Sequence, residues 1–162
     1  MALTGFVLAA AAHVFALAGV DVAEHFPPVW FLHIGIFIVF VPFVLSSRKI
    51  LGKHPSLADM RALVPSWVFF AGVAVFIYAL VNFALFVAAT QGGNPSMEAG
   101  KYVLQNHGRL IRELSHAEYV ALRVNELRGF SGHWLFFYFV SFAYFMFAKR
   151  PAAPNPPTAS DE

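Results

Sequence analysis

Cysteine is absent from this chain of 162 residues, and charged residues make up only 12% of it. Without cysteine the chain has no disulfide bonds, iron–sulfur clusters or thiolate-bound metals. The share of charged residues is about half that of an ordinary soluble domain. The net charge is +2, and no basic run interleaved with aromatic residues occurs. We therefore expect no nucleic-acid partner.

Sequence motifs that carry catalysis are also missing. The chain has no nucleophile elbow, no His-Glu-x-x-His and no phosphate-binding glycine loop. His116-Ala117-Glu118 has the H-x-E form of zinc deaminases, but their Pro-Cys-x-x-Cys half needs cysteine. The sequence therefore favours a protein without enzymatic activity.

Apolar residues are present in excess, at 59% of the chain, and 19 of them are phenylalanine. They fall in four blocks of roughly membrane-spanning length, at about 3–20, 29–45, 67–89 and 132–147. The predicted fold class is an all-α membrane protein. It is a four-transmembrane-helix bundle with a small extramembrane hairpin-plus-helix insertion between spans 3 and 4. Residues 1–148 would form this single domain in the lipid bilayer, and the proline-rich residues 149–162 a disordered tail.

The first predicted span carries small residues at intervals of four and three. On a helix these positions form one narrow stripe, which lets neighbouring helices approach closely in lipid. The start of the chain lacks the basic region of a signal peptide, so we expect this span to be retained. The small residues are Gly5, Ala9, Ala12, Ala16 and Gly19.

The connections between spans differ in charge. Residues 46–64 hold four basic side chains and one acidic side chain, whereas residues 21–28 hold only acidic ones. The positive-inside rule then predicts an N-in and C-in integral protein of a bacterial-type inner (plasma) membrane. Ser56 and Asp59 resemble a capping box and predict a short surface helix after Pro55. The four basic residues are Arg48, Lys49, Lys53 and Arg61.

Residues 100–131 form the predicted extramembrane module. Asn106-His107-Gly108 predicts the turn of a hairpin over 101–114. Ser115 and Glu118 have the spacing of a capping box, which predicts a helix after Ser115. Gly129 and Gly132 would allow a bend before span four. Residues 91–96 are expected to be a flexible loop.

This module is interpreted either as a structured cap on the bundle or as a docking surface. The leading hypothesis is a non-enzymatic accessory or scaffold subunit that presents residues 100–134 to another membrane or outer-face protein. Assembly into an oligomer is compatible with the sequence. The candidate partner-binding residues are Tyr102, His107, Arg109, Arg112, Tyr119 and Arg123.

Counting along the predicted spans places a polar layer in the half of the bilayer next to this module. Such residues usually face the bundle interior, and interhelical hydrogen bonds are one interpretation. A pocket for a quinone or another small molecule is a second. The third is a redox protein, because imidazole binds both haem and metal ions. The candidate cofactor-binding residues are His13, His33, Asn82 and Tyr138, and the candidate ligands of haem or a metal are His13, His33 and His133.

Overall fold

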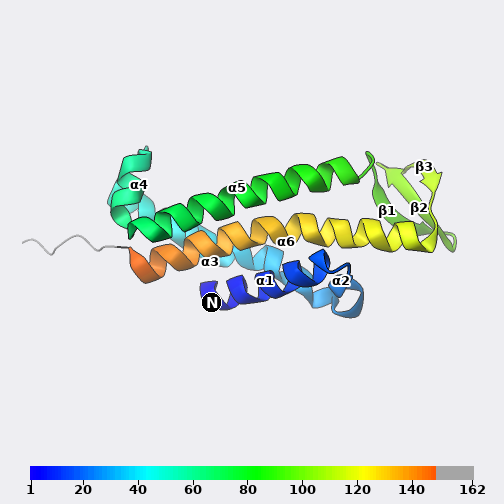
Figure 1. The fold of residues 1–162 in the computed structure, drawn as a ribbon, viewed down its shortest axis with the longest axis horizontal. Helices are drawn as coiled ribbons and strands as arrows, with labels where there is room; N and C mark the ends of the chain where they lie inside the picture. The colour runs from blue at the N-terminus through cyan, green and yellow to red at the C-terminus, as the bar shows by residue number, and fades with distance from the viewer. Residues whose placement is uncertain (149–162) are drawn as a thin grey trace, which may run out of the picture.

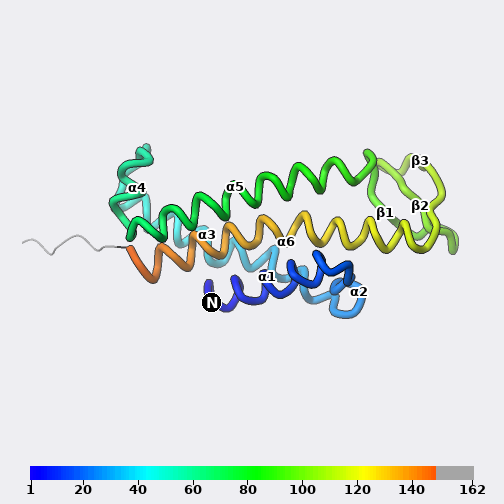
Figure 2. Tube along the Cα trace, viewed as in Figure 1, coloured from blue at the N-terminus to red at the C-terminus, as the bar shows by residue number. Residues whose placement is uncertain are grey.

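The computed structural model describes residues 1–148, which form a mostly helical chain with one small antiparallel sheet. The sheet lies at one end of the helices and α4 at the other (Figures 1 and 2). We call these the sheet end and the α4 end. The predicted tail, 149–162, lies outside the described residues. The elements are α1 (Ala2–Leu17), α2 (Val22–His25), η1 (Pro27–Trp30), α3 (Phe31–Leu51), α4 (Leu57–Leu63), α5 (Ser66–Ala89), β1 (Asn94–Glu98), β2 (Lys101–Asn106), β3 (Arg109–Glu113) and α6 (His116–Phe147).

Three helices are long and apolar enough to cross a membrane: Pro27–Leu51, Ser66–Ala89 and His116–Phe147. The first predicted span is a shorter helix of 16 residues. At a rise of 1.5 Å per residue it is about 24 Å long, less than the roughly 30 Å of a bilayer core. It ends at Leu17 because Gly19 turns the chain with a φ of 82°. Figure 1 shows α1 starting part-way along α6 and running toward the sheet end, where it stops short of the sheet.

Helix α6 is the central element, because α1, α3 and α5 all pack against it. Trp134 and Leu127 of α6 are completely buried in the shared core. Four of the five residues of the predicted small-residue stripe, Gly5, Ala9, Ala12 and Ala16, are buried in α1. The fifth, Gly19, lies beyond the end of the helix and is exposed. Close packing along α6 therefore holds the bundle together.

Glycines in α6 and its neighbours make room for large side chains. A Cβ on Gly132 would lie 2.1 Å from Asn82 Nδ2, and one on Gly129 would lie 2.3 Å from Phe86 Cγ. The expected bend does not divide α6, which is a single helix through both glycines. The two glycines let α5 approach α6 closely, because a methyl group at either position would overlap a side chain of α5.

The sheet has the order β1-β2-β3. The predicted hairpin is confirmed: β2 and β3 pair antiparallel around His107 and Gly108, whose φ values are 49° and 77°. Strand β1 (Asn94–Glu98) takes up the second half of the segment 91–96, which was expected to be a flexible loop, and it pairs with β2. Pro95 is tolerated there because β1 is an edge strand.

A second apolar cluster attaches the sheet to the first turns of α6. It consists of Leu104 of β2, Leu114 and Leu122, with Tyr102 and Tyr119 packed against it. The predicted capping box starts α6, since the Ser115 hydroxyl accepts from the Glu118 amide at 3.2 Å. The equivalent box of Ser56 and Asp59 starts α4, as predicted.

Candidate functional site

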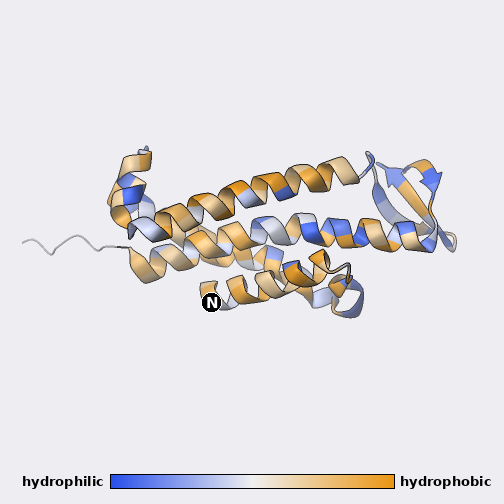
Figure 3. Ribbon diagram, viewed as in Figure 1, coloured by the Kyte–Doolittle hydropathy of each residue, from blue (hydrophilic) through white to orange (hydrophobic). Residues whose placement is uncertain are grey.

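Helix α6 is longer than a bilayer core. Its 32 residues span about 48 Å, which exceeds the roughly 30 Å hydrocarbon thickness by about 18 Å. In Figure 3, α1, α3, α5 and the later part of α6 are mainly hydrophobic, whereas the sheet and the first turns of α6 carry most of the hydrophilic residues. The first turns of α6 and the sheet therefore extend beyond the membrane-spanning segments. We call residues 94–122 the sheet module.

His13 of α1 lies at the centre of a hydrogen-bonded chain that links three helices. Its Nδ1 is 2.8 Å from Ser131 Oγ of α6, and its Nε2 is hydrogen-bonded to the hydroxyl of Tyr78 in α5. Ser131 donates its proton to the Arg128 carbonyl at 3.2 Å. The consistent arrangement has Nδ1–H donating to Ser131 and Nε2 accepting from Tyr78. Both ring nitrogens are engaged, so neither is free for haem iron or a metal ion.

A second chain of polar contacts ties α6 to α5. Asn82 donates to the Arg128 carbonyl at 2.9 Å. The Arg128 guanidinium donates to Asn125 Oδ1 at 2.8 Å, and Asn125 donates to the Phe86 carbonyl at 3.1 Å. The buried Nε of Arg128 has no hydrogen-bond partner within residues 1–148. These contacts fix the position of α5 along α6, next to the close approach at Gly132.

His33 and His133 meet in an aromatic cluster between α3 and α6. Their ring centroids are 5.7 Å apart, with the ring planes at 81°. The Trp134 indole donates to His33 Nδ1 at 3.1 Å. Phe130 contacts both histidine rings, with centroids 5.5 Å from His33 and 5.4 Å from His133. This cluster brings together two of the three predicted metal ligands, whereas His13 has other partners.

The four predicted cofactor residues each have a separate hydrogen-bond partner, and none pairs with another. Tyr138 donates to the Leu32 carbonyl at 2.8 Å. Its ring lies where a Cβ on Gly5 or Gly35 would overlap it. No group of three or more His, Cys, Asp or Glu side chains that could hold a metal occurs in the part of the chain that the structure describes. The polar layer thus connects helices to one another, which is the interhelical interpretation.

Several polar residues of this network were missed by sequence reasoning. Ser131 was assigned to a linker outside span four, and Arg128 to the end of a surface helix. A signal was present: Asn125, Arg128 and Ser131 are spaced by three, which places them on neighbouring turns if the helix continues. Expecting a bend at the glycines hid that pattern.

In the sheet module, three of the predicted partner-binding residues are already engaged inside the chain. Tyr102 and Tyr119 pack together with ring centroids 4.7 Å apart. Arg112 donates to Glu118 at 2.8 Å and to Gln91 at 3.0 Å. Hydrogen bonds from Ser115 and from Arg112 lower the pKa of the Glu118 carboxyl to about 2. These contacts hold the sheet rigidly on α6.

The remaining predicted partner-binding residues differ in exposure. Arg123 donates to Glu126 at 3.0 Å and lies 3.7 Å from the buried carboxylate of Asp21, which joins α6 to the start of α2. His107 is exposed on the turn between β2 and β3, and Arg109 is exposed at the start of β3. Three apolar side chains of the sheet are exposed as well: Met97 (60%), Leu110 (54%) and Ile111 (45%).

Three helices that are long and apolar enough to cross a membrane, with a small three-stranded sheet at one end, define the class of the chain, a mostly helical protein of the membrane type. A scan against protein-family models and searches of curated proteins and solved structures found no match. Any functional assignment therefore rests on the geometry of this chain.

Proposed function

We propose that this protein is a non-enzymatic membrane subunit whose bundle holds the sheet module at one membrane face for a partner protein. The observation that carries the proposal is the continuity of α6 from the bundle core to the sheet. One helix contributes Trp134 to the membrane core and Leu122 to the core of the sheet module. A module on such a support has a fixed position and orientation relative to the membrane.

Rigid display favours binding because a preorganised surface loses little conformational entropy when a partner docks. The apolar cluster under the sheet and the bonds of Arg112 to Glu118 and Gln91 supply that rigidity. Arg109, Leu110 and Ile111 of β3 are all exposed. Exposed apolar side chains beside a positive charge are the composition of protein-binding surfaces.

Free strand edges are a further feature that suits a protein partner. In the described chain β1 and β3 are each paired on one side only, with β2. An edge strand presents unpaired backbone amides and carbonyls that can accept an added strand. The positive-inside rule predicts a non-cytoplasmic location for this module, since the basic residues 48–61 lie at the α4 end.

Replacing the sheet tests this proposal. Residues 94–113 are exchanged for a Gly/Ser linker, which leaves α6 and its capping box in place. The proteins that co-purify in mild detergent are then quantified against the unchanged chain. We expect specific partners to be lost, while the helical content and the unfolding stability of the bundle are kept. The matched control is a variant in which a Gly/Ser linker replaces residues 52–63 at the α4 end. This variant should retain those partners. The docking proposal fails if the sheet-replaced chain retains them too.

A redox or metal-binding protein is the second candidate. The predicted ligand pair was His13 and His33, and the contact between the rings of His33 and His133 is the observation that favours a two-histidine site. An absorption spectrum and a metal analysis of the purified protein test it. A Soret band or stoichiometric metal that is lost in His133→Ala would support this candidate. A colourless, metal-free protein would remove it.

A further inference from the structure

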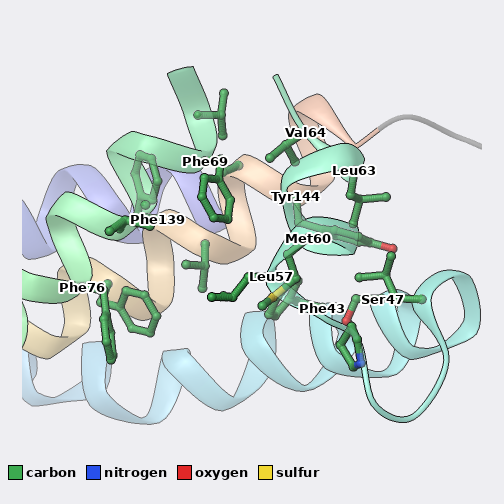
Figure 4. A pocket seen from close by; sticks show the side chains of 18 residues that line it. Phe43, Ser47, Leu57, Met60, Leu63, Val64, Phe69, Phe76, Phe139 and Tyr144 are labelled. Atoms are coloured by element: carbon green, nitrogen blue, oxygen red, sulfur yellow. The ribbon is translucent and has the colours of Figure 1, made fainter. Parts of the chain in front are cut away.

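A cavity of about 360 Å³ opens at the α4 end, far from the sheet module (Figure 4). Its walls come from α3, α5 and α6, and α4 lies across it. The volume falls within the roughly 300–1,000 Å³ of small-molecule sites. Leu57 and Met60 of α4 line the cavity, yet they are 70% and 38% exposed. No residue of α4 is buried, so an occupant of the cavity would bury the apolar side of this helix.

The chemistry of the lining selects an alkyl chain. Almost all of the lining side chains are apolar, and two hydroxyls are among the few exceptions. Ser47 donates its hydroxyl to the Val44 carbonyl at 3.1 Å, and the Tyr144 hydroxyl is hydrogen-bonded to Ser46 at 2.7 Å. Both hydroxyls are already engaged within the chain. A quinone ring or a sugar would lose its water without gaining partners there, whereas a hydrocarbon chain loses nothing.

Four basic residues lie close in the sequence to residues that line the cavity. Arg48 and Lys49 follow Ser47 in the last turns of α3, Lys53 precedes Pro55, and Arg61 follows Met60 in α4. None of these four pairs with a carboxylate within residues 1–148.

The one acidic residue of this connection offsets only one of the four positive charges and leaves residues 46–64 with a net charge of +3. Asp59 is held by the amide and hydroxyl of Ser56, and these hydrogen bonds lower its pKa. Arg61 lies over the ring of Phe70, with 5.4 Å between its Cζ and the ring centroid. The connection beside the cavity therefore carries a net positive charge.

We propose that this cavity binds one acyl chain of an anionic phospholipid, with the headgroup held by Arg48, Lys49, Lys53 and Arg61. The alkyl chain fills the space between α3, α5 and α6. The phosphate meets these four basic residues. This site is independent of the sheet module, because it lies at the opposite end of α6.

Native mass spectrometry of the purified full-length protein in mild detergent tests the site. The probes are phosphatidylglycerol and phosphatidylcholine with identical acyl chains. We expect one saturable phosphatidylglycerol per chain, bound at least tenfold more tightly than phosphatidylcholine. Each basic residue near a phosphate contributes about 1 kcal/mol, or roughly fivefold in affinity. Changing all four basic residues to Gln should abolish the preference.

Two variants examine the cavity itself. Gly72 lines it, and a Cβ there would make only an ordinary contact, 3.6 Å from Phe139 Cε1. Gly72→Leu should fill the space and reduce lipid retention at least tenfold. Ala74→Leu, on an exposed face of α5, is the matched control and should bind as wild type. The double variant Leu57→Gln and Met60→Gln makes the lining of the cavity more polar. Both residues are exposed, so the bundle core is unchanged.

Two results would overturn the proposal. One is equal retention of both lipids by the wild type. The other is unchanged phosphatidylglycerol binding in both Gly72→Leu and the Leu57/Met60 variant, with their unfolding stability confirmed.

Discussion

The substitution Gly132→Ala gives the clearest test of how α5 and α6 fit together. The new Cβ would lie 2.1 Å from Asn82 Nδ2 and 2.9 Å from its Cγ. Asn82 is 4% exposed and donates to the Arg128 carbonyl at 2.9 Å. Its amide therefore cannot move aside without losing that hydrogen bond or displacing α5.

The expected loss of stability follows from three contributions. Overpacking a tight interface costs about 1–3 kcal/mol. The lost hydrogen bond costs about 0.6 kcal/mol on average in a membrane bundle. Replacing glycine by alanine inside a helix stabilises the folded protein by about 1 kcal/mol. The net effect for Gly132→Ala is a loss of about 0.5–2.5 kcal/mol. If Gly132 served only as a hinge, the same change would stabilise the protein by about 1 kcal/mol.

The assay is reversible unfolding of the purified protein in detergent micelles or bicelles. Gly72→Ala is the matched control, because its Cβ would make only an ordinary contact with Phe139. The two Gly→Ala variants should differ by about 1.5–3.5 kcal/mol, the sum of the overpacking and hydrogen-bond contributions. Adding Asn82→Ala to Gly132→Ala should restore part of the loss, with a coupling of about 1 kcal/mol or more. Equal stability of Gly132→Ala and Gly72→Ala would refute the close-packing role.

Three further outcomes follow from the polar contacts. Acidification should loosen the junction of sheet and helix. In the folded protein the pKa of Glu118 is about 2, below its ordinary value of 4.5. The stability that the ionised Glu118 contributes is therefore complete above pH 4.5 and is lost as the pH falls toward 2. Intrinsic-rate-corrected amide exchange of residues 112–119 measures this, and Glu118→Gln should remove the pH dependence. Tyr138→Phe loses only the bond to the Leu32 carbonyl and should cost about 0.6 kcal/mol in the unfolding assay, whereas Tyr138→Ala should cost about 3–5 kcal/mol by emptying the core. His13→Phe removes the hydrogen bonds to Tyr78 and Ser131, of which Ser131 keeps its bond to the Arg128 carbonyl, and should destabilise by about 1–3 kcal/mol. A smaller loss than for His33→Phe would contradict the network.

Local signals in the sequence predicted the elements whose chemistry is local. The hairpin around His107-Gly108 depends on a turn that glycine allows, and both capping boxes depend on a spacing of three residues. The buried stripe of α1 depends on helical periodicity. Each of these follows from a few neighbouring residues, so the sequence contains it directly.

Features that depend on distant partners were not predicted. Strand β1 exists because β2 supplies its hydrogen bonds, although Asn94 and Pro95 by themselves indicate a loop. The continuity of α6 past Gly129 and Gly132 depends on Phe86 and Asn82 filling the space beside the glycines. The pairing of His13 with Ser131 joins residues 118 positions apart. Counting residues along the spans predicted that the polar side chains lie at a similar depth. Which of them contact one another depends on how the helices pack.

Photo-crosslinking from the sheet in native membranes tests the central claim most directly, namely that the bundle displays the sheet module to a partner. A photoreactive residue replaces Leu110, which is 54% exposed on β3, and Phe83, 49% exposed on α5, is the control position. The proposal predicts one discrete protein adduct from position 110 and none of that mass from position 83. The absence of any protein adduct from position 110, at full expression of a folded chain, would contradict it.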